Sequence, residues 1–305
     1  MKKKWIMLGS AVGISSIVMV TTGFSAMAST SGYEAYKSAL KNTKTVQNVA
    51  VQAEAALQDN GAVLASANGS FKVSLDSKTA SGSANVSVNG NQQALSFYKE
   101  ANQTVLKSAA SDVYFVKQEN EKKHKTENKL NETEIPQQIE TVIDALVGNL
   151  KDYVAVDTKD DGSKDISIQL DNAQIPTVVN ALAPIAIKEA TKTEHDGEKN
   201  DDAVQANALP FQEDFLKNAA PQLTQDIKIE HVSIKATVNS SNYLSHQEAD
   251  LTVSGKDDAG TVHQVTLHLQ ANLSDYNLTK PETVDLTGKT VQTLKHDHQG
   301  KQEHE

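Results

Sequence analysis

The feature that most constrains this chain is a two-residue alternation of apolar and polar side chains, which returns in segments far apart in the sequence. In residues 49–57 the apolar positions are Val49, Val51, Ala53, Ala55 and Leu57. A period of two places these side chains on one face of a β-strand and the polar ones between them on the other. The pattern returns in residues 65–75, 80–88 and 262–273, and Asn89-Gly90-Asn91 is a hairpin signal between two runs. These runs predict an antiparallel meander in the first half and further strands near the end.

Other segments carry helical signals. Ser31 and Glu34 form a capping box, which predicts a helix over residues 32–43. Apolar residues recur at helical spacing through residues 136–150, and a second apolar helix is expected over 176–190. Because amphipathic helices bury one face, we expect them to cover the sheet. The predicted fold class is therefore α+β, a curved antiparallel half-barrel sheet covered by amphipathic helices.

Polar segments divide this predicted fold. Residues 117–134 and 191–207 are almost wholly polar, and we interpret them as insertions in a single domain that spans residues 29–294. Residues 295–305 contain no apolar side chain and are rich in histidine and acidic groups. We expect this tail to be disordered.

The N-terminus has the features of a secretory signal peptide. Three lysines at positions 2–4 precede the uncharged stretch 5–24, and Ala26-Met27-Ala28 is a small-x-small cleavage site. We expect cleavage after Ala28 and release into the extracellular or cell-wall space. The alternative is that residues 5–24 are retained as a membrane anchor.

Composition excludes several classes of function. The chain has no cysteine, so disulfides, thiol nucleophiles and cysteine-based metal sites are excluded. Its net charge is −10 and its basic residues are all lysine, whereas nucleic-acid binding calls for a basic face and arginine. No serine-hydrolase, metalloprotease or phosphate-loop motif occurs. We therefore expect a non-enzymatic protein without a cofactor.

The histidines and acidic turns do not predict a metal site. His296, His298 and His304 could hold Zn²⁺ or Ni²⁺ loosely, but a disordered tail cannot fix their geometry. His263 and His268 are expected on or near the polar side of the last strand, where they need no special role. The Asp-Asp-Gly turn at 160–162 lacks the spacing of a calcium loop.

The order of the predicted elements resembles that of the LolA/LppX superfamily. A leading helix, an antiparallel meander, two apolar helices and more strands end in L-S-D-Y-N-L-T-K-P at 273–281. Members of this superfamily carry lipoproteins and lipids in the periplasm or cell wall. The resemblance implies an incomplete curved barrel, with helices over its open side and acyl chains between the two. The chain lacks the cysteine that anchors some members.

Two functions follow from this resemblance and from the apolar runs. The first is an exported envelope protein that binds a lipid or another amphiphile in a cavity between sheet and helices. The second is an envelope interaction or regulatory module with a filled core, which recognises a protein partner or a cell-wall polymer. Side chains that face inward look alike in the two cases, so both remain open. The residues expected to line the cavity are Val49, Val51, Leu57, Phe71, Val73, Leu75, Val86, Val88, Leu95, Phe97, Ile139, Val142, Ile143, Leu146, Val265, Leu267 and Leu269.

Overall fold

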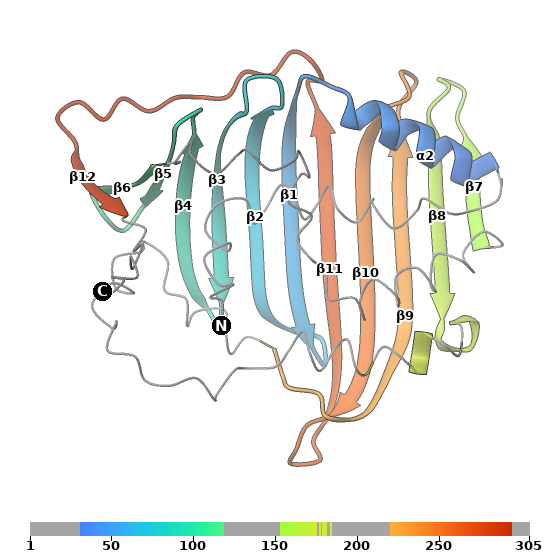
Figure 1. The fold of residues 1–305 in the computed structure, drawn as a ribbon. Coiled ribbons are helices and arrows are strands. Elements are labelled where there is room, and N and C mark those ends of the chain that lie inside the picture. Colours follow the sequence, from blue (N-terminus) through green and yellow to red (C-terminus); the bar gives the residue numbers. More distant parts are fainter. Residues whose placement is uncertain are drawn as a thin grey trace, which may run out of the picture.

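A single β-sheet dominates the structure (Figure 1). The computed structural model describes residues 31–118, 153–175 and 220–294, with positions 177, 179–181 and 184. Its strands are β1 (Asn48–Asp59), β2 (Ala62–Ser74), β3 (Thr79–Val88), β4 (Asn91–Lys99), β5 (Gln103–Ser108), β6 (Val113–Gln118), β7 (Val154–Thr158), β8 (Lys164–Asp171), β9 (Gln225–Val238), β10 (Leu244–Lys256), β11 (Val262–Ser274) and β12 (Thr290–Leu294).

The strands follow one another across the sheet in the order β12-β6-β5-β4-β3-β2-β1-β11-β10-β9-β8-β7. Neighbours are antiparallel except for β12 and β6, which run parallel. The late strand β11 pairs with β1, from Ala50 opposite Ser274 to Asp59 opposite Val265. This central pairing joins the N-terminal meander and the later strands into one curved sheet (Figure 1).

The two tightest hairpins form at Asn-Gly pairs. Asn60 and Gly61 have φ values of 50° and 83° between β1 and β2, and Asn89 and Gly90 have values of 48° and 81° between β3 and β4. Two consecutive residues with positive φ are what a type I′ turn requires, and asparagine and glycine adopt this conformation most readily. The hairpin predicted at residues 89–91 is confirmed.

One α-helix, α2 (Ser31–Lys44), lies across the ends of the strands from β11 to β7 (Figure 1). It confirms the helix predicted over residues 32–43. Its buried residues Tyr36, Ala39 and Leu40 pack on the strands, as the helical spacing requires. At its first turn, a Cβ added to Gly32 would lie only 2.8 Å from Cγ1 of Val154 on β7, so the helix approaches this strand closely.

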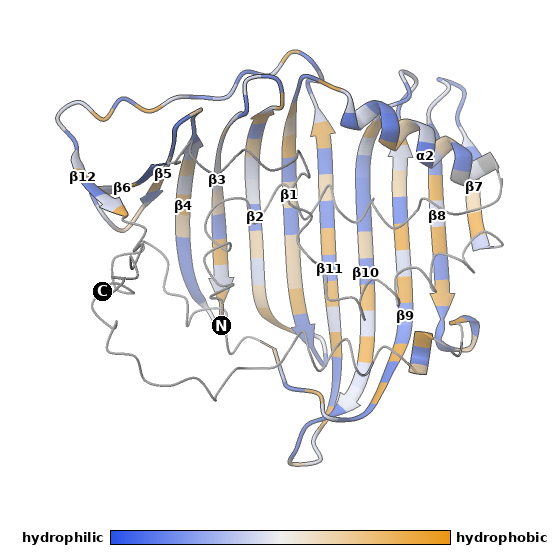
Figure 2. Ribbon diagram, viewed as in Figure 1, coloured by the Kyte–Doolittle hydropathy of each residue, from blue (hydrophilic) through white to orange (hydrophobic). Residues whose placement is uncertain are grey.

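The register of the strands places the alternating runs on one common face. Val51 of β1 lies between Phe71 of β2 and Leu273 of β11, and all three belong to a small buried cluster. A larger cluster joins α2 to β8, β9 and β10. The alternation of hydropathy is visible along β9, β10 and β11 in Figure 2. We call the side that carries these clusters the apolar face and the opposite side the polar face.

The predicted fold class was wrong. The described residues form an open sheet of twelve strands. The helices with described bounds are α2 and the short 3-10 helix η3 (Asn172–Gln174), and the described positions 177, 179–181 and 184 are also helical. The described residues are not a half-barrel covered by helices. Alternation shows which face of a strand is apolar, but it carries no information about how far the sheet extends or what covers it.

Several predicted segments lie outside the described residues. They are the signal segment 1–28, the lid helix 136–150 with Ile139, Val142, Ile143 and Leu146, the insertion 191–207 and the tail 295–305. The insertion 117–134 is described only at its first two residues, which end β6. Most of the expected helix 176–190 is likewise outside them. In the described part of the chain, no helix has the length and apolar character needed to cross a membrane.

Candidate functional site

Two regions of the sheet are candidates for function, and the first is a partly exposed part of the apolar face. It adjoins both buried clusters and crosses six adjacent strands, from β4 to β10. We call it the apolar strip. Its side chains are Ala55, Leu57, Ala65, Ala67, Val86, Leu95, Ala249, Leu251, Leu267 and Leu269.

The register shows how the apolar strip is built. Leu57 lies between Leu267 of β11 and Ala65 of β2, which makes one row of apolar side chains across the strands. In the next row, Ala55 lies between Leu269 and Ala67. Leu251, Leu267 and Leu57 are therefore neighbours in the first row, and alanines lie on both sides of Leu269 in the second, so the strip combines leucines with small side chains.

The structure divides the predicted lining residues between this strip and the core. Leu57, Val86, Leu95, Leu267 and Leu269 lie in the apolar strip. Buried or packed in the two clusters are Val49, Val51, Phe71, Val73, Phe97 and Val265. Val88 is 3% exposed and buried, whereas Leu75 follows the end of β2 and is 51% exposed. The prediction of which strand face is apolar is therefore accurate, but seven of the thirteen described candidates belong to the core.

Phe71 lies on β2 at the border between the apolar strip and the small buried cluster. Its ring contacts Phe97 and covers two glycines. Its ring lies against Phe97 with 5.8 Å between centroids. A Cβ added to Gly69 would lie 2.6 Å from Cζ of Phe71, and one added to Gly82 would lie 2.5 Å from Cδ1. The ring therefore lies flat on the sheet, in space that only glycine leaves open at these two positions.

A small pocket beside α2 is lined by Tyr36, Ile234, Gln247, Ala249 and Leu269, and has a volume of about 30 Å³. Such a volume holds little more than a water molecule. A ligand of the size of an acyl chain would have to lie along the apolar strip itself.

A polar group lies at the lower end of the strip. His263 and Asp59 lie on the apolar face. Each differs by an even number of positions from the leucines of its own strand, so its side chain points to the same side as theirs. Nδ1 of His263 lies 2.7 Å from Oδ2 of Asp59, and Nε2 lies 3.5 Å from Oδ2 of Asp257. The hydrogen bond to Asp59 is the largest of the effects that raise the pKa of His263. The other oxygen of Asp59, Oδ1, is buried and has no hydrogen-bond partner.

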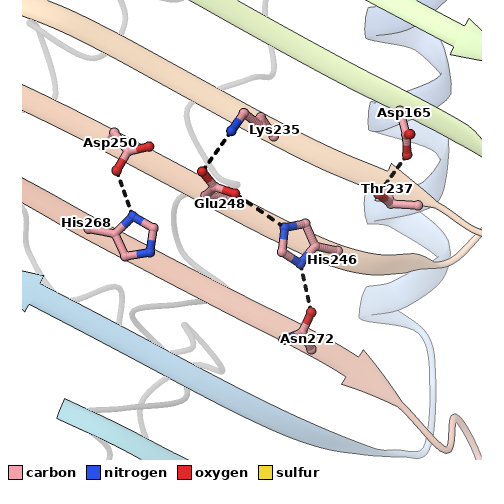
Figure 3. Close-up of polar contacts among 8 residues, drawn as sticks. All are labelled: Asp165, Lys235, Thr237, His246, Glu248, Asp250, His268 and Asn272. Carbon is pink, nitrogen blue, oxygen red and sulfur yellow. Dashed lines mark hydrogen bonds and ion pairs between the residues drawn. The ribbon is translucent and has the colours of Figure 1, made fainter.

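The second candidate region is a cluster of titratable side chains on the polar face (Figure 3). His246, Glu248 and Asp250 alternate along β10, so all three point to the same side, and His268 of β11 lies directly opposite Asp250. Nδ1 of His268 lies 2.7 Å from Oδ1 of Asp250. One ligand atom from each of Glu248, Asp250 and His268 fits within 4.8 Å of the others.

Neighbouring side chains hold this cluster in place (Figure 3). Nδ1 of His246 lies 2.7 Å from Oδ1 of Asn272, and its Nε2 lies 3.7 Å from Oε2 of Glu248. Nζ of Lys235 donates a hydrogen bond of 2.9 Å to the other oxygen of Glu248. This bond from Lys235 holds the pKa of the Glu248 carboxyl below its usual range, so the group is ionised at neutral pH.

Sequence reasoning missed this cluster. It placed His268 correctly on the polar side but treated it as a solvent-facing histidine. The signal that could have found the cluster is the H-x-E-x-D spacing at residues 246–250, which puts three possible ligands on one strand face. The partner His268 becomes visible only with the β10–β11 register.

Comparisons with known proteins add little. No protein-family model matches the chain, and no curated protein does. A DUF1329 family protein from Desulfovibrio piger is 9% identical, with 80% of this chain and 92% of that chain covered and a TM-score of 0.20. A protein of unknown function with a hot dog fold from Alicyclobacillus acidocaldarius is 9% identical, with 83% and 90% covered and a TM-score of 0.10. Scores this low carry no argument about fold or function.

Proposed function

We propose that this protein is an exported, non-enzymatic protein of the cell envelope that binds a lipid or another amphiphile along the apolar strip. The observation that carries the proposal is the partial exposure of apolar side chains at the centre of the sheet, with Leu267 37% exposed. Continuous exposed apolar surfaces on soluble domains commonly mark binding sites. Burying an acyl chain there would contribute roughly 0.8 kcal/mol per CH₂ group.

The ends of the strip suit a molecule with an apolar chain and a polar headgroup. At one end, the rings of Phe71 and Phe97 close the apolar surface. At the other end lie His263 and Asp59, a hydrogen-bonded pair beside which a polar headgroup could lie. An amphiphile lying across the strip would cover the leucines and place its headgroup next to this pair.

Binding of a fluorescent fatty acid to the purified protein tests the proposal. Leu267→Asp places a short charged side chain in the middle of the strip, where it cannot reach away to water as a lysine could. We expect the variant to bind the probe at least about tenfold more weakly, since burying an unpaired carboxylate costs well over 1.4 kcal/mol. The control is Gln264→Asp, which adds the same charge to an exposed position on the polar face of the same strand.

Two results would contradict the proposal. One is a parent protein that binds no probe and, when purified from its own host, shows a lipid-free mass in native mass spectrometry. The other is equal loss of binding in the two variants, which would indicate a general charge effect. The first result would favour the interaction module with a filled core.

A further inference from the structure

We propose that Glu248, Asp250 and His268 on the polar face form a binding site for a divalent transition-metal ion of the Zn²⁺ type, with His246 available as a fourth ligand. The site is independent of the apolar strip, because the strand register places it on the opposite face of the sheet.

The types of ligand select the class of metal. Imidazole nitrogen together with carboxylate oxygen is the ligand set of Zn²⁺ and its first-row neighbours, whereas Ca²⁺ and Mg²⁺ are bound by oxygen alone. One ligand atom from each of the three residues lies within 4.8 Å of the others. Ligand–metal distances near 2.0–2.2 Å therefore require only small side-chain movements.

The hydrogen bond between His246 and Asn272 leaves the other ring nitrogen of His246 facing the cluster. Because the Oδ1 atom of Asn272 can only accept a hydrogen bond, Nδ1 of His246 carries the proton of the neutral ring. Its Nε2 lone pair then faces Oε2 of Glu248 at 3.7 Å, so two acceptors point at each other without a hydrogen between them. A metal ion, or a proton on the ring, resolves this contact.

The scaffold of the site is rigid. β10 and β11 are central strands with hydrogen-bonded neighbours on both sides, and the ladder places Asp250 opposite His268. The contact of His246 with Asn272 resembles those that fix the imidazoles of metal sites. Lys235 is the cation that now neutralises Glu248, and its side chain is 47% exposed, so it can move aside.

Calorimetric titration of the full chain with Zn²⁺ at neutral pH tests the site. We expect one bound ion, and at least tenfold weaker binding in His268→Asn and in Glu248→Gln, each of which loses one ligand. His231→Asn is the matched control: His231 also pairs with a carboxylate, Asp171, across two strands, but it lies outside the cluster. It should bind as the parent does. Circular dichroism establishes that each variant is folded. If His268→Asn does not fold, Glu248→Gln tests the site by itself.

The C-terminal histidines are a second possible location for Zn²⁺ and need their own variant. With His296, His298 and His304 all changed to asparagine, the calorimetric binding should persist. Binding that is lost in this tail variant and unchanged in His268→Asn would overturn the proposal. So would a parent that binds no Zn²⁺, or an equal loss in His231→Asn.

Discussion

Replacing Gly82 with alanine is expected to destabilise the protein, although the same change in an open strand is stabilising. The backbone of Gly82 is not in the left-handed region, so the glycine is not required by its φ angle. Instead, an added Cβ would lie 2.5 Å from Cδ1 of Phe71 and 2.6 Å from the backbone oxygen of Ser70. The ring has to leave its place on the sheet, or the two strands have to separate.

The magnitude follows from two opposing effects. Alanine in place of glycine in a strand is favourable by ~0.5–1 kcal/mol when space is available. Overpacking a buried site costs ~1–3 kcal/mol, and Phe71 is buried, with 8% of its surface exposed. We therefore expect a net loss of roughly 1–2 kcal/mol, which lowers the melting temperature by roughly 2–8 °C for a chain of this size.

Thermal and urea unfolding, followed by circular dichroism, measure this effect. Ser83→Ala is the control, because Ser83 is the next residue, is exposed and points to the other face; it should change stability by less than ~0.5 kcal/mol. In a Phe71→Leu background, Gly82→Ala should cost less, since the ring is absent. A neutral or stabilising Gly82→Ala would refute the argument that the aromatic ring occupies this space.

Three further predictions concern other parts of the chain. Thr43→Val removes the hydroxyl that accepts a 3.0 Å hydrogen bond from the buried backbone N–H of Leu244, and should cost ~1–3 kcal/mol in urea unfolding. Because the folded-state pKa of His263 is raised, its stabilising pair with Asp59 is complete at acidic pH and is lost as the pH rises through that pKa. The free energy of unfolding should therefore fall by up to ~1 kcal/mol from slightly acidic to alkaline pH, and His263→Gln should abolish this slope. N-terminal sequencing of exported protein should begin at Ser29, and recovery of intact chain in membranes would indicate a retained anchor.

Much of the sheet could be predicted from local sequence. The alternation of apolar side chains from Val49 to Leu57 correctly predicted the apolar face of β1. The Asn89-Gly90 pair correctly predicted a hairpin. These features depend on residues close in the chain: side chains alternate along any strand, and asparagine and glycine adopt positive φ in any hairpin. The candidate site was predicted less well, because parity does not distinguish Val51, which is buried in a core cluster, from Leu267, which is partly exposed.

Other features are determined only by the tertiary structure, because they depend on residues that lie far apart in the sequence. The pairing of β1 with β11 joins residues more than two hundred positions apart and makes the described strands one continuous sheet. The same kind of pairing brings His268 to Asp250 and the ring of Phe71 over Gly82. The sequence by itself determined which side chains share a strand face, because that is a property of the extended backbone. Which strands become neighbours, and therefore which side chains meet, is set by the whole sheet.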